Sequence, residues 1–83
     1  MPEGIEAQTR QSLTNIGAVL EEAGLSFNDV VKTTVLLDDI KNFAAMNAVY
    51  AEFFPETKPA RVCYQVAALP AGAMVEIDAV AGK

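Results

Sequence analysis

Two runs of alternating side chains, Ala60–Ala68 and Ala73–Ala81, close the chain and constrain its fold more than any other feature. Successive side chains of a strand point to opposite faces, so each run divides its residues into two sets. One set is apolar and needs a cover: Val62, Tyr64, Val66, Val75, Ile77 and Ala79. The other set is mainly polar: Arg61, Cys63, Gln65, Glu76 and Asp78. We therefore expect a sheet with one covered face.

A hairpin is the expected connection between the two runs, because the link Leu69–Gly72 is short and contains proline and glycine. In the register that follows, Gln65 faces Glu76 and Cys63 faces Asp78. The polar set then occupies one face of the hairpin, with Glu76 diagonal to Cys63.

Two amphipathic segments can supply the cover. The first spans about Ile5–Ala23 and repeats its apolar residues with helical spacing. The second spans about Asn42–Phe54, where Pro55 ends it, and its apolar stripe has one polar member, Asn47. Between the two segments, Val30–Leu37 is rich in β-branched residues and predicts a further strand.

The order helix, strand, helix, strand, strand predicts an α+β fold, a two-layer sandwich of two helices on a mixed sheet. With 83 residues the chain has room for a single domain, residues 1–83. A domain of this size buries only somewhat more than about 60% of its unfolded surface, and association between copies is a common way to gain stability.

Charge and composition argue against several classes of protein. The chain has six basic and eleven acidic residues, and the basic ones form no run, which disfavours nucleic-acid binding. It contains no apolar stretch long enough for a membrane span and no signal-peptide pattern, so a cytoplasmic location is the default expectation. One cysteine and no histidine exclude a disulfide framework, a zinc site and a histidine-based triad.

The polar set of the sheet combines groups that can act on a small anion. Arg61 can bind a carboxylate through two parallel hydrogen bonds, and Glu76 can orient and deprotonate a water molecule. Plainer interpretations stay open beside this one. In these interpretations, Arg61 and Glu76 would form an ion pair on the surface, Cys63 would pack as a small apolar side chain, and Asn47 would be a structural amide.

Six segments, in order along the chain, resemble the Rid (YjgF-like) family of reactive imine deaminases. They are VKTTV from Val31, FAAMNAVY from Phe43, FFP from Phe53, KPAR from Lys58, VAALP from Val66 and VEIDAVA from Val75. The resemblance extends from about Ile5 to Ala81. It implies a chorismate-mutase-like fold and homotrimers with clefts between the subunits.

The resemblance also implies a reaction, the hydrolysis of 2-imino or enamine acids such as 2-aminoacrylate to 2-keto acids and ammonia, without a metal or organic cofactor. By motif, Arg61 holds the substrate carboxylate and Glu76 positions the attacking water. Cys63 lines the pocket without acting as a nucleophile, and Asn47 supports the pocket wall.

The sequence departs from the family pattern at its start. Family members carry N-terminal strands before the first helix, and these supply a pocket tyrosine and a Ser-Gly-Gln segment that have no counterpart here. We therefore expect one strand of the sheet to have an unpaired edge, which invites pairing with another chain. A pocket without these segments is expected to lack part of its wall, which counts against activity.

Two other functions are compatible with the same residues. One is the binding of small 2-keto acids without catalysis, in which Arg61 still holds the carboxylate. The other is a protein-interaction or ribonuclease-type role, and the acidic balance of the chain argues against RNA as the ligand.

Overall fold

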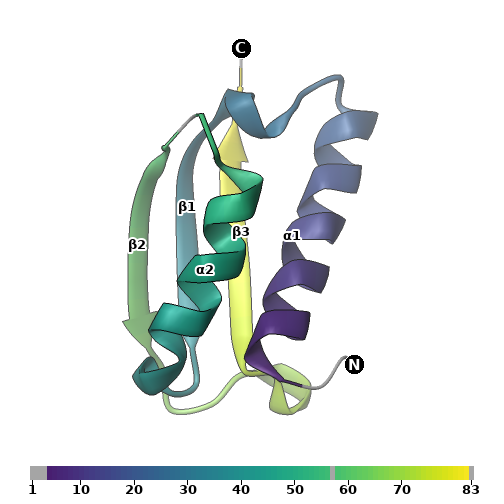
Figure 1. Ribbon diagram of the computed structural model, residues 1–83. Helices are drawn as coiled ribbons and strands as arrows, with labels where there is room; N and C mark the ends of the chain where they lie inside the picture. Colours follow the sequence, from purple (N-terminus) through teal and green to yellow (C-terminus); the bar gives the residue numbers. More distant parts are fainter. Residues whose placement is uncertain (1–3, 57, 83) are drawn as a thin grey trace.

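Two helices pack on one face of a three-stranded mixed sheet in the computed structural model of the chain, which describes residues 4–56 and 58–82 (Figure 1). The helices are α1 (Ile5–Glu22) and α2 (Phe43–Phe53), and the strands are β1 (Val30–Leu37), β2 (Ala60–Gln65) and β3 (Val75–Ala81). Short 3-10 helices at Phe27–Asp29, Ile40–Asn42 and Pro70–Gly72 precede β1, α2 and β3. The predicted α+β class and element order are confirmed.

The central strand of the sheet is β1, since the strand order is β2-β1-β3. It pairs in parallel with β2 and antiparallel with β3. The parallel pair needs a crossover, and α2 provides it between β1 and β2. In this register Thr33 of β1 lies opposite Arg61 on one side and Ala79 on the other.

The predicted hairpin between the last two strands is wrong, because β1 lies between them. Gln65 pairs with Leu37 instead of Glu76, and Glu76 pairs with Leu36. The α2 crossover directs β2 to one edge of β1 and leaves the other edge to β3. The short link with proline and glycine therefore joins two strands that do not touch.

The predicted faces are confirmed for β3 and wrong for β2. Val62 and Tyr64 lie on the open face of the sheet, with 44% and 50% of their surface exposed, while Arg61 and Cys63 face the helices. The physical reason is the parallel register, which places Arg61 beside the buried Thr33. Side chains at paired positions of neighbouring strands share a face, so β1 decides which side β2 presents.

The core fills the space between the two helices and the covered face of the sheet. Its buried apolar residues are Leu13, Leu20, Val30, Val35, Leu37, Met46, Val49, Tyr50, Phe54, Val75 and Ile77. After the C-cap of α1 at Ala23, Gly24 takes the left-handed backbone conformation (φ 75°) that commonly follows a helix end. The amide of Leu25 then donates to the carbonyl of Leu20 at 2.8 Å.

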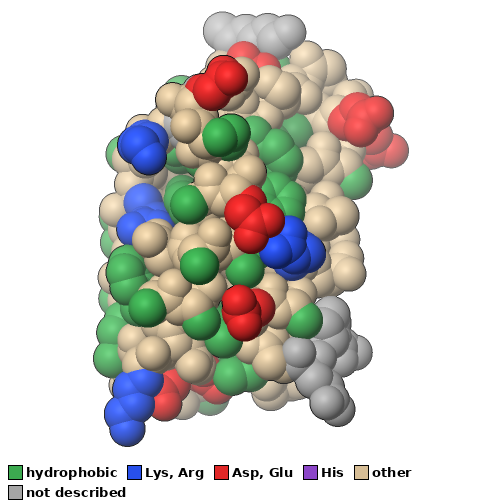
Figure 2. All heavy atoms as spheres, in the orientation of Figure 1, with side chains coloured by type: hydrophobic (Ala, Val, Ile, Leu, Met, Phe, Trp, Pro, Cys, Tyr) green, Lys and Arg blue, Asp and Glu red, His purple; other side chains and the backbone are tan. Residues whose placement is uncertain are grey.

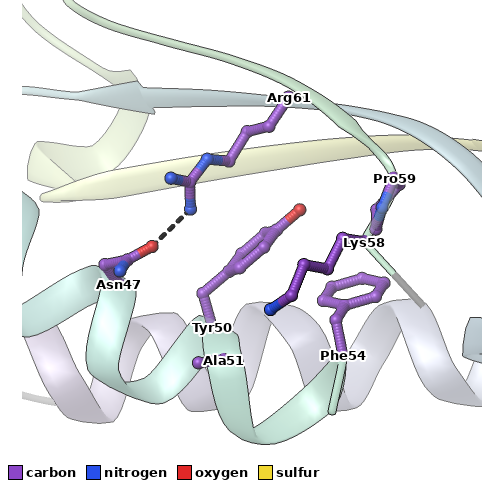
Figure 3. A pocket seen from close by; sticks show the side chains of 7 residues that line it. All are labelled: Asn47, Tyr50, Ala51, Phe54, Lys58, Pro59 and Arg61. Carbon is purple, nitrogen blue, oxygen red and sulfur yellow. Dashed lines mark hydrogen bonds between the residues drawn. The ribbon is translucent and has the colours of Figure 1, made fainter. Parts of the chain in front are cut away.

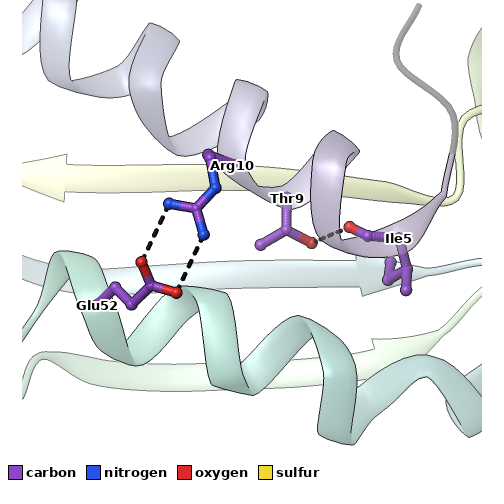
Figure 4. Close-up of polar contacts among 4 residues, drawn as sticks. All are labelled: Ile5, Thr9, Arg10 and Glu52. Carbon is purple, nitrogen blue, oxygen red and sulfur yellow. Dashed lines mark hydrogen bonds and ion pairs between the residues drawn. The ribbon is translucent and has the colours of Figure 1, made fainter.

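An ion pair joins the outer surfaces of the two helices. Both terminal nitrogens of Arg10 in α1 donate to the carboxylate of Glu52 in α2, at 3.0 and 3.1 Å (Figure 4). Because both side chains are exposed, the pair adds little to stability compared with the core beneath it.

Removal of core volume tests this packing. The side chain of Leu13 has no exposed surface, so Leu13→Ala should lower the free energy of unfolding by about 2–5 kcal/mol, through lost burial and the cavity left behind. The control is Val19→Ala on the same helix. Val19 is 66% exposed, and its truncation should change stability by less than about 0.5 kcal/mol. Urea denaturation measures both; equal effects would contradict the placement of α1.

Candidate functional site

The side chain of Arg61 crosses from β2 to α2 and is held there by three residues of that helix, two of which, Asn47 and Tyr50, are drawn beside it in Figure 3. Its guanidinium carbon lies 5.3 Å from the ring centroid of Phe43 and 4.8 Å from that of Tyr50. Its Nη1 donates a hydrogen bond to Oδ1 of Asn47. Residues at spacings of four and three share one face of a helix, so α2 presents two rings and an amide to the same cation.

The position of Tyr50 is itself fixed from the sheet. Its hydroxyl lies 2.7 Å from Oγ1 of Thr33, and both residues are buried. Its ring packs against Phe54, with centroids 4.7 Å apart. A buried hydroxyl that lacks a partner is costly, so this pair holds the tyrosine against β1. Tyr50 therefore contacts the guanidinium of Arg61 from a position that Thr33 and Phe54 hold in place.

A cavity of about 400 Å³ opens beside the guanidinium (Figure 3). Its lining residues are Asn47, Tyr50, Ala51, Phe54, Lys58, Pro59 and Arg61. Two of these carry positive charge, Lys58 and Arg61, and none of the lining residues in the described chain is acidic. A concave site with one sign of charge concentrates ligands of the opposite sign, so this cavity suits a small anion.

The thiol of Cys63 lies on the same face of β2 as Arg61, outside the residues that line the cavity. Partial burial raises the pKa of the thiol, and the nearby charge of Arg61 opposes this shift more weakly. The thiolate is therefore scarce at neutral pH, which favours a packing role for Cys63 over a nucleophilic one.

The carboxylate of Glu76 is exposed on the open face of the sheet, opposite to the face that carries Arg61. The prediction that Arg61, Cys63 and Glu76 share one face is wrong within one copy of the chain. The structure brings together Arg61 and Asn47, places Cys63 on the same side, and leaves Glu76 on the other. The cause is again the register with β1, since Arg61 pairs with Thr33 and Glu76 with Leu36.

The apolar stripe of α2 is expected from the sequence to cover the sheet, and Tyr50 is indeed buried in the core. The contact that Phe43 and Tyr50 also make with Arg61 was not expected. A signal was present in the spacing, because Asn47 lies four residues after Phe43 and three before Tyr50. Lys58 precedes Arg61 in the KPAR segment and lines the same cavity.

Three features that would indicate nucleic acid, a metal ion or a membrane as a ligand are considered in turn for the described part of the chain. The face formed by the two helices shows no continuous basic patch (Figure 2). Within residues 4–56 and 58–82, no group of three or more histidine, cysteine or acidic side chains is arranged to hold a metal ion. None of the helices in that part of the chain is long and apolar enough to cross a membrane.

Comparison with known proteins gives consistent results. The family described as endoribonuclease L-PSP matches residues 1–83. A RutC family protein of Pyrococcus horikoshii is 57% identical over 79 residues, which are 95% of this chain and 63% of that protein. A 2-iminobutanoate/2-iminopropanoate deaminase of Capra hircus is 53% identical over 81 residues, which are 98% of this chain and 59% of the deaminase.

Solved structures show the same architecture. The crystal structure of the E. coli YjgF gene product has a TM-score of 0.94 and 46% identity to this chain, and the match covers 98% of this chain and 66% of YjgF. The chain thus spans about three fifths of the length of the curated relatives it matches.

The reactivity of Cys63 tests the environment described for it. Cys63 is the only cysteine of the sequence, so a thiol reagent reports on it alone. Because burial raises its pKa, less thiolate is present at any pH below that pKa, and reaction at pH 8 should be slower in the folded protein than in urea. The expected rate in the folded protein rises with pH into the alkaline range. Equal rates in both states would show an exposed thiol with an ordinary pKa.

Proposed function

The chain belongs to the endoribonuclease L-PSP family, which includes YjgF and the Rid proteins, and on this basis we propose that it hydrolyses reactive 2-imino acids to 2-keto acids and ammonia. The observation that carries the proposal is the held guanidinium of Arg61 beside a cavity without an acidic lining residue in the described chain. The relatives named 2-iminobutanoate/2-iminopropanoate deaminase support the choice of substrate class.

Arg61 binds the carboxylate of the substrate in this proposal. A guanidinium has five N–H donors in one plane, and Asn47 uses one of them, so a pair of parallel donors is left for a carboxylate. The rings of Phe43 and Tyr50 restrict the guanidinium before the substrate arrives. A preorganised donor loses less entropy on binding and fixes the orientation of the substrate.

Glu76 accepts a proton from the attacking water. Because it lies on the other face of its own sheet, the Glu76 that serves a given Arg61 belongs to a neighbouring copy of the chain. The open face supports such an association, since Val62, Tyr64 and Val80 are between 44% and 59% exposed on it. Exposed apolar surface marks a contact with another chain where it is contiguous. We propose a homotrimer, with a site at each interface.

In this reaction the protein mainly orients the substrate and the attacking water and supplies a base. Water attacks C2 of the protonated imine, its oxygen bonds to C2, and the π electrons of the C=N bond move to nitrogen while a proton passes to Glu76. Glu76 then returns this proton to the nitrogen of the tetrahedral intermediate, and the C–N bond breaks with its electron pair leaving on ammonia. The hydroxyl oxygen forms the C2=O bond as it releases its proton to Glu76 or water, which completes the 2-keto acid. Cys63 contributes as a neutral thiol, and Asn47 as a support for Arg61. Orientation and a nearby base account for this chemistry.

A second candidate function is the binding of 2-keto acids without turnover. The observation that favours it is the separation of the groups, because Arg61, Asn47 and the cavity belong to one copy of the chain, whereas Glu76 lies on the other face of the sheet. An RNA ligand is disfavoured by the formal charge of −5.

Substitution of the chain's two arginines tests the role of Arg61. Arg61→Ala removes the charged donors to the substrate, and kcat/KM for enzymatically generated 2-aminoacrylate should fall by roughly 10- to 100-fold or more. Arg10→Ala is the matched control, because Arg10 pairs with Glu52 on the outer surface of the helices and should be dispensable. Release of the keto acid over the buffer rate is the measurement.

The same preparations separate catalysis from binding. If the wild-type protein does not accelerate keto-acid release, the deaminase proposal fails for this chain. Calorimetry with pyruvate then decides the second function, which requires binding that Arg61→Ala abolishes and Arg10→Ala preserves.

A mixing experiment tests whether the site is shared between copies. Arg61→Ala and Glu76→Ala should each be inactive, and co-refolded mixtures should recover activity, since some interfaces combine an intact Arg61 with an intact Glu76. Random mixing makes about a quarter of such interfaces complete, so about a quarter of the wild-type rate is expected.

The control for the mixture is Arg61→Ala combined with the double variant Arg61→Ala/Glu76→Ala, in which no interface is complete. Light scattering confirms that the variants still assemble. Mixed assemblies without recovered activity would contradict a site built from two copies.

A further inference from the structure

The cavity of the candidate site has a second cation that the proposed reaction leaves unused. Lys58 and Arg61 both line the cavity, and Figure 3 shows both side chains extending from the start of β2 and the segment before it toward α2. In the proposed reaction Arg61 binds the substrate carboxylate, and Asn47 supports its guanidinium. The ammonium of Lys58 has no part in that reaction, which therefore does not account for its place in the cavity.

The chain brings the two cations to one cavity through a break at Pro59. Because β2 begins at Ala60, Arg61 belongs to the strand and Lys58 to the segment before it. In a continuous strand, two residues at this spacing would point to opposite faces. Pro59 restricts the backbone of the preceding residue toward extended conformations, and Ala60 is already paired with Lys32 of β1. The backbone of Lys58 is therefore held close to the cavity.

The charge of Lys58 is not neutralised by a carboxylate of the described residues. Within residues 4–56 and 58–82 the only ion pair joins Arg10 to Glu52, on the outer surface of the helices. Besides the two cations, the lining of the cavity consists of aromatic rings, an amide, a methyl group and a proline. In a partly enclosed site of this kind a cation and an anion are screened less than on an open surface. The ammonium is thus available to an anionic group of a ligand.

The cavity is also larger than a three-carbon substrate requires. A water molecule takes about 30 Å³ of liquid, so the cavity of about 400 Å³ has the space of roughly a dozen waters. A three-carbon imino acid that binds Arg61 through its carboxylate leaves part of that space to water. Since Lys58 forms part of the lining, a longer substrate can reach the ammonium from the same position.

We infer that Lys58 is a specificity-determining residue and that the site prefers dicarboxylic 2-imino acids, the imines of acidic amino acids. This inference rests on the proposed function, whose carboxylate site it extends. Arg61 binds the carboxylate next to the imine carbon, and Lys58 binds the carboxylate at the far end of the substrate. The reaction at C2 is unchanged, because Lys58 exchanges neither a proton nor an electron pair with the substrate.

The alternative role for Lys58 is steering. A cation at the mouth of a cavity raises the local concentration of anions without binding any particular group of them. Salt separates the two roles. Long-range steering is screened at high ionic strength, whereas an ion pair in a partly enclosed site is screened much less.

Stable 2-keto acids are suitable probes, because they share the carboxylates of the imines and are the expected products. Calorimetry compares 2-ketoglutarate with 2-ketopentanoate, which has the same carbon chain and lacks the second carboxylate. The wild-type protein should bind 2-ketoglutarate about tenfold more tightly, since the added ion pair lies in a partly enclosed site. This preference should remain at about 1 M salt.

Three variants assign the preference to one side chain. Lys58→Met removes the charge and keeps an unbranched side chain, so the ratio of the two Kd values should fall to about one. Lys58→Arg restores the charge and should restore most of the ratio. Lys41→Met is the matched control, because it removes the same charge from an exposed residue outside the lining of the cavity, and it should keep the wild-type ratio.

Three results would overturn the inference. They are equal binding of the two keto acids by the wild-type protein, equal loss of the preference in Lys58→Met and Lys41→Met, and a preference that disappears at about 1 M salt. The last result would assign Lys58 to steering. Binding of neither keto acid would also overturn the inference, whatever the turnover.

Turnover of 2-aminoacrylate by the same preparations separates this inference from the proposed function. Acceleration of keto-acid release together with equal binding of the two keto acids overturns only the role of Lys58. A preference for 2-ketoglutarate without acceleration overturns only the deaminase reaction, and the site is then a binding site for dicarboxylic keto acids.

Discussion

Hydrogen bonding along both edges of β1 determines which side chains of β2 and β3 face the helices. Because β2 and β3 each take their register from β1, the side chains beside Thr33 on both neighbours point toward the helices. This places Arg61 against α2 and Ala79 against the core. The same constraint turns Glu76 and Asp78 outward, since they pair with the alternate residues of β1. Fold and site are thus consequences of one strand's position.

The two arginines of the chain show how the site keeps its charge. Arg10 is paired with the carboxylate of Glu52, which satisfies its charge at the surface. Arg61 is partly buried, yet its partners are an amide and two aromatic rings. Rings and amides stabilise a cation without cancelling its charge. The difference leaves Arg61 able to attract an anion, whereas a carboxylate in the place of Asn47 would already occupy its donors.

Local sequence patterns predicted the elements well and their partners poorly. The span Val30–Leu37 is the same in prediction and structure, and both helices begin and end within a residue or two of the expected positions. Alternation cannot say which face of a strand is covered or which strand lies beside it, since these depend on contacts distant in sequence. In β2 the apolar Val62 and Tyr64 lie on the open face of the sheet. The rule that apolar side chains are buried therefore predicted the wrong face of this strand to be covered by the helices. The motif resemblance assigned Arg61 and Asn47 to one pocket without any of this geometry, and the structure brings the two side chains into contact.

In the proposed reaction, the separation of Arg61 from Glu76 makes assembly part of the chemistry. In one copy the sheet itself stands between the two groups, and no side-chain rotation brings them together. The same open face that carries Glu76 also exposes Val62, Tyr64 and Val80, so the surface that would gain most from burial is the one that presents the carboxylate. Association through this face would bury the apolar residues and deliver the acid to a neighbour's cavity in a single event. Under this proposal, carboxylate binding within a copy and water activation between copies are separable functions, and each depends on a different face of the same three strands.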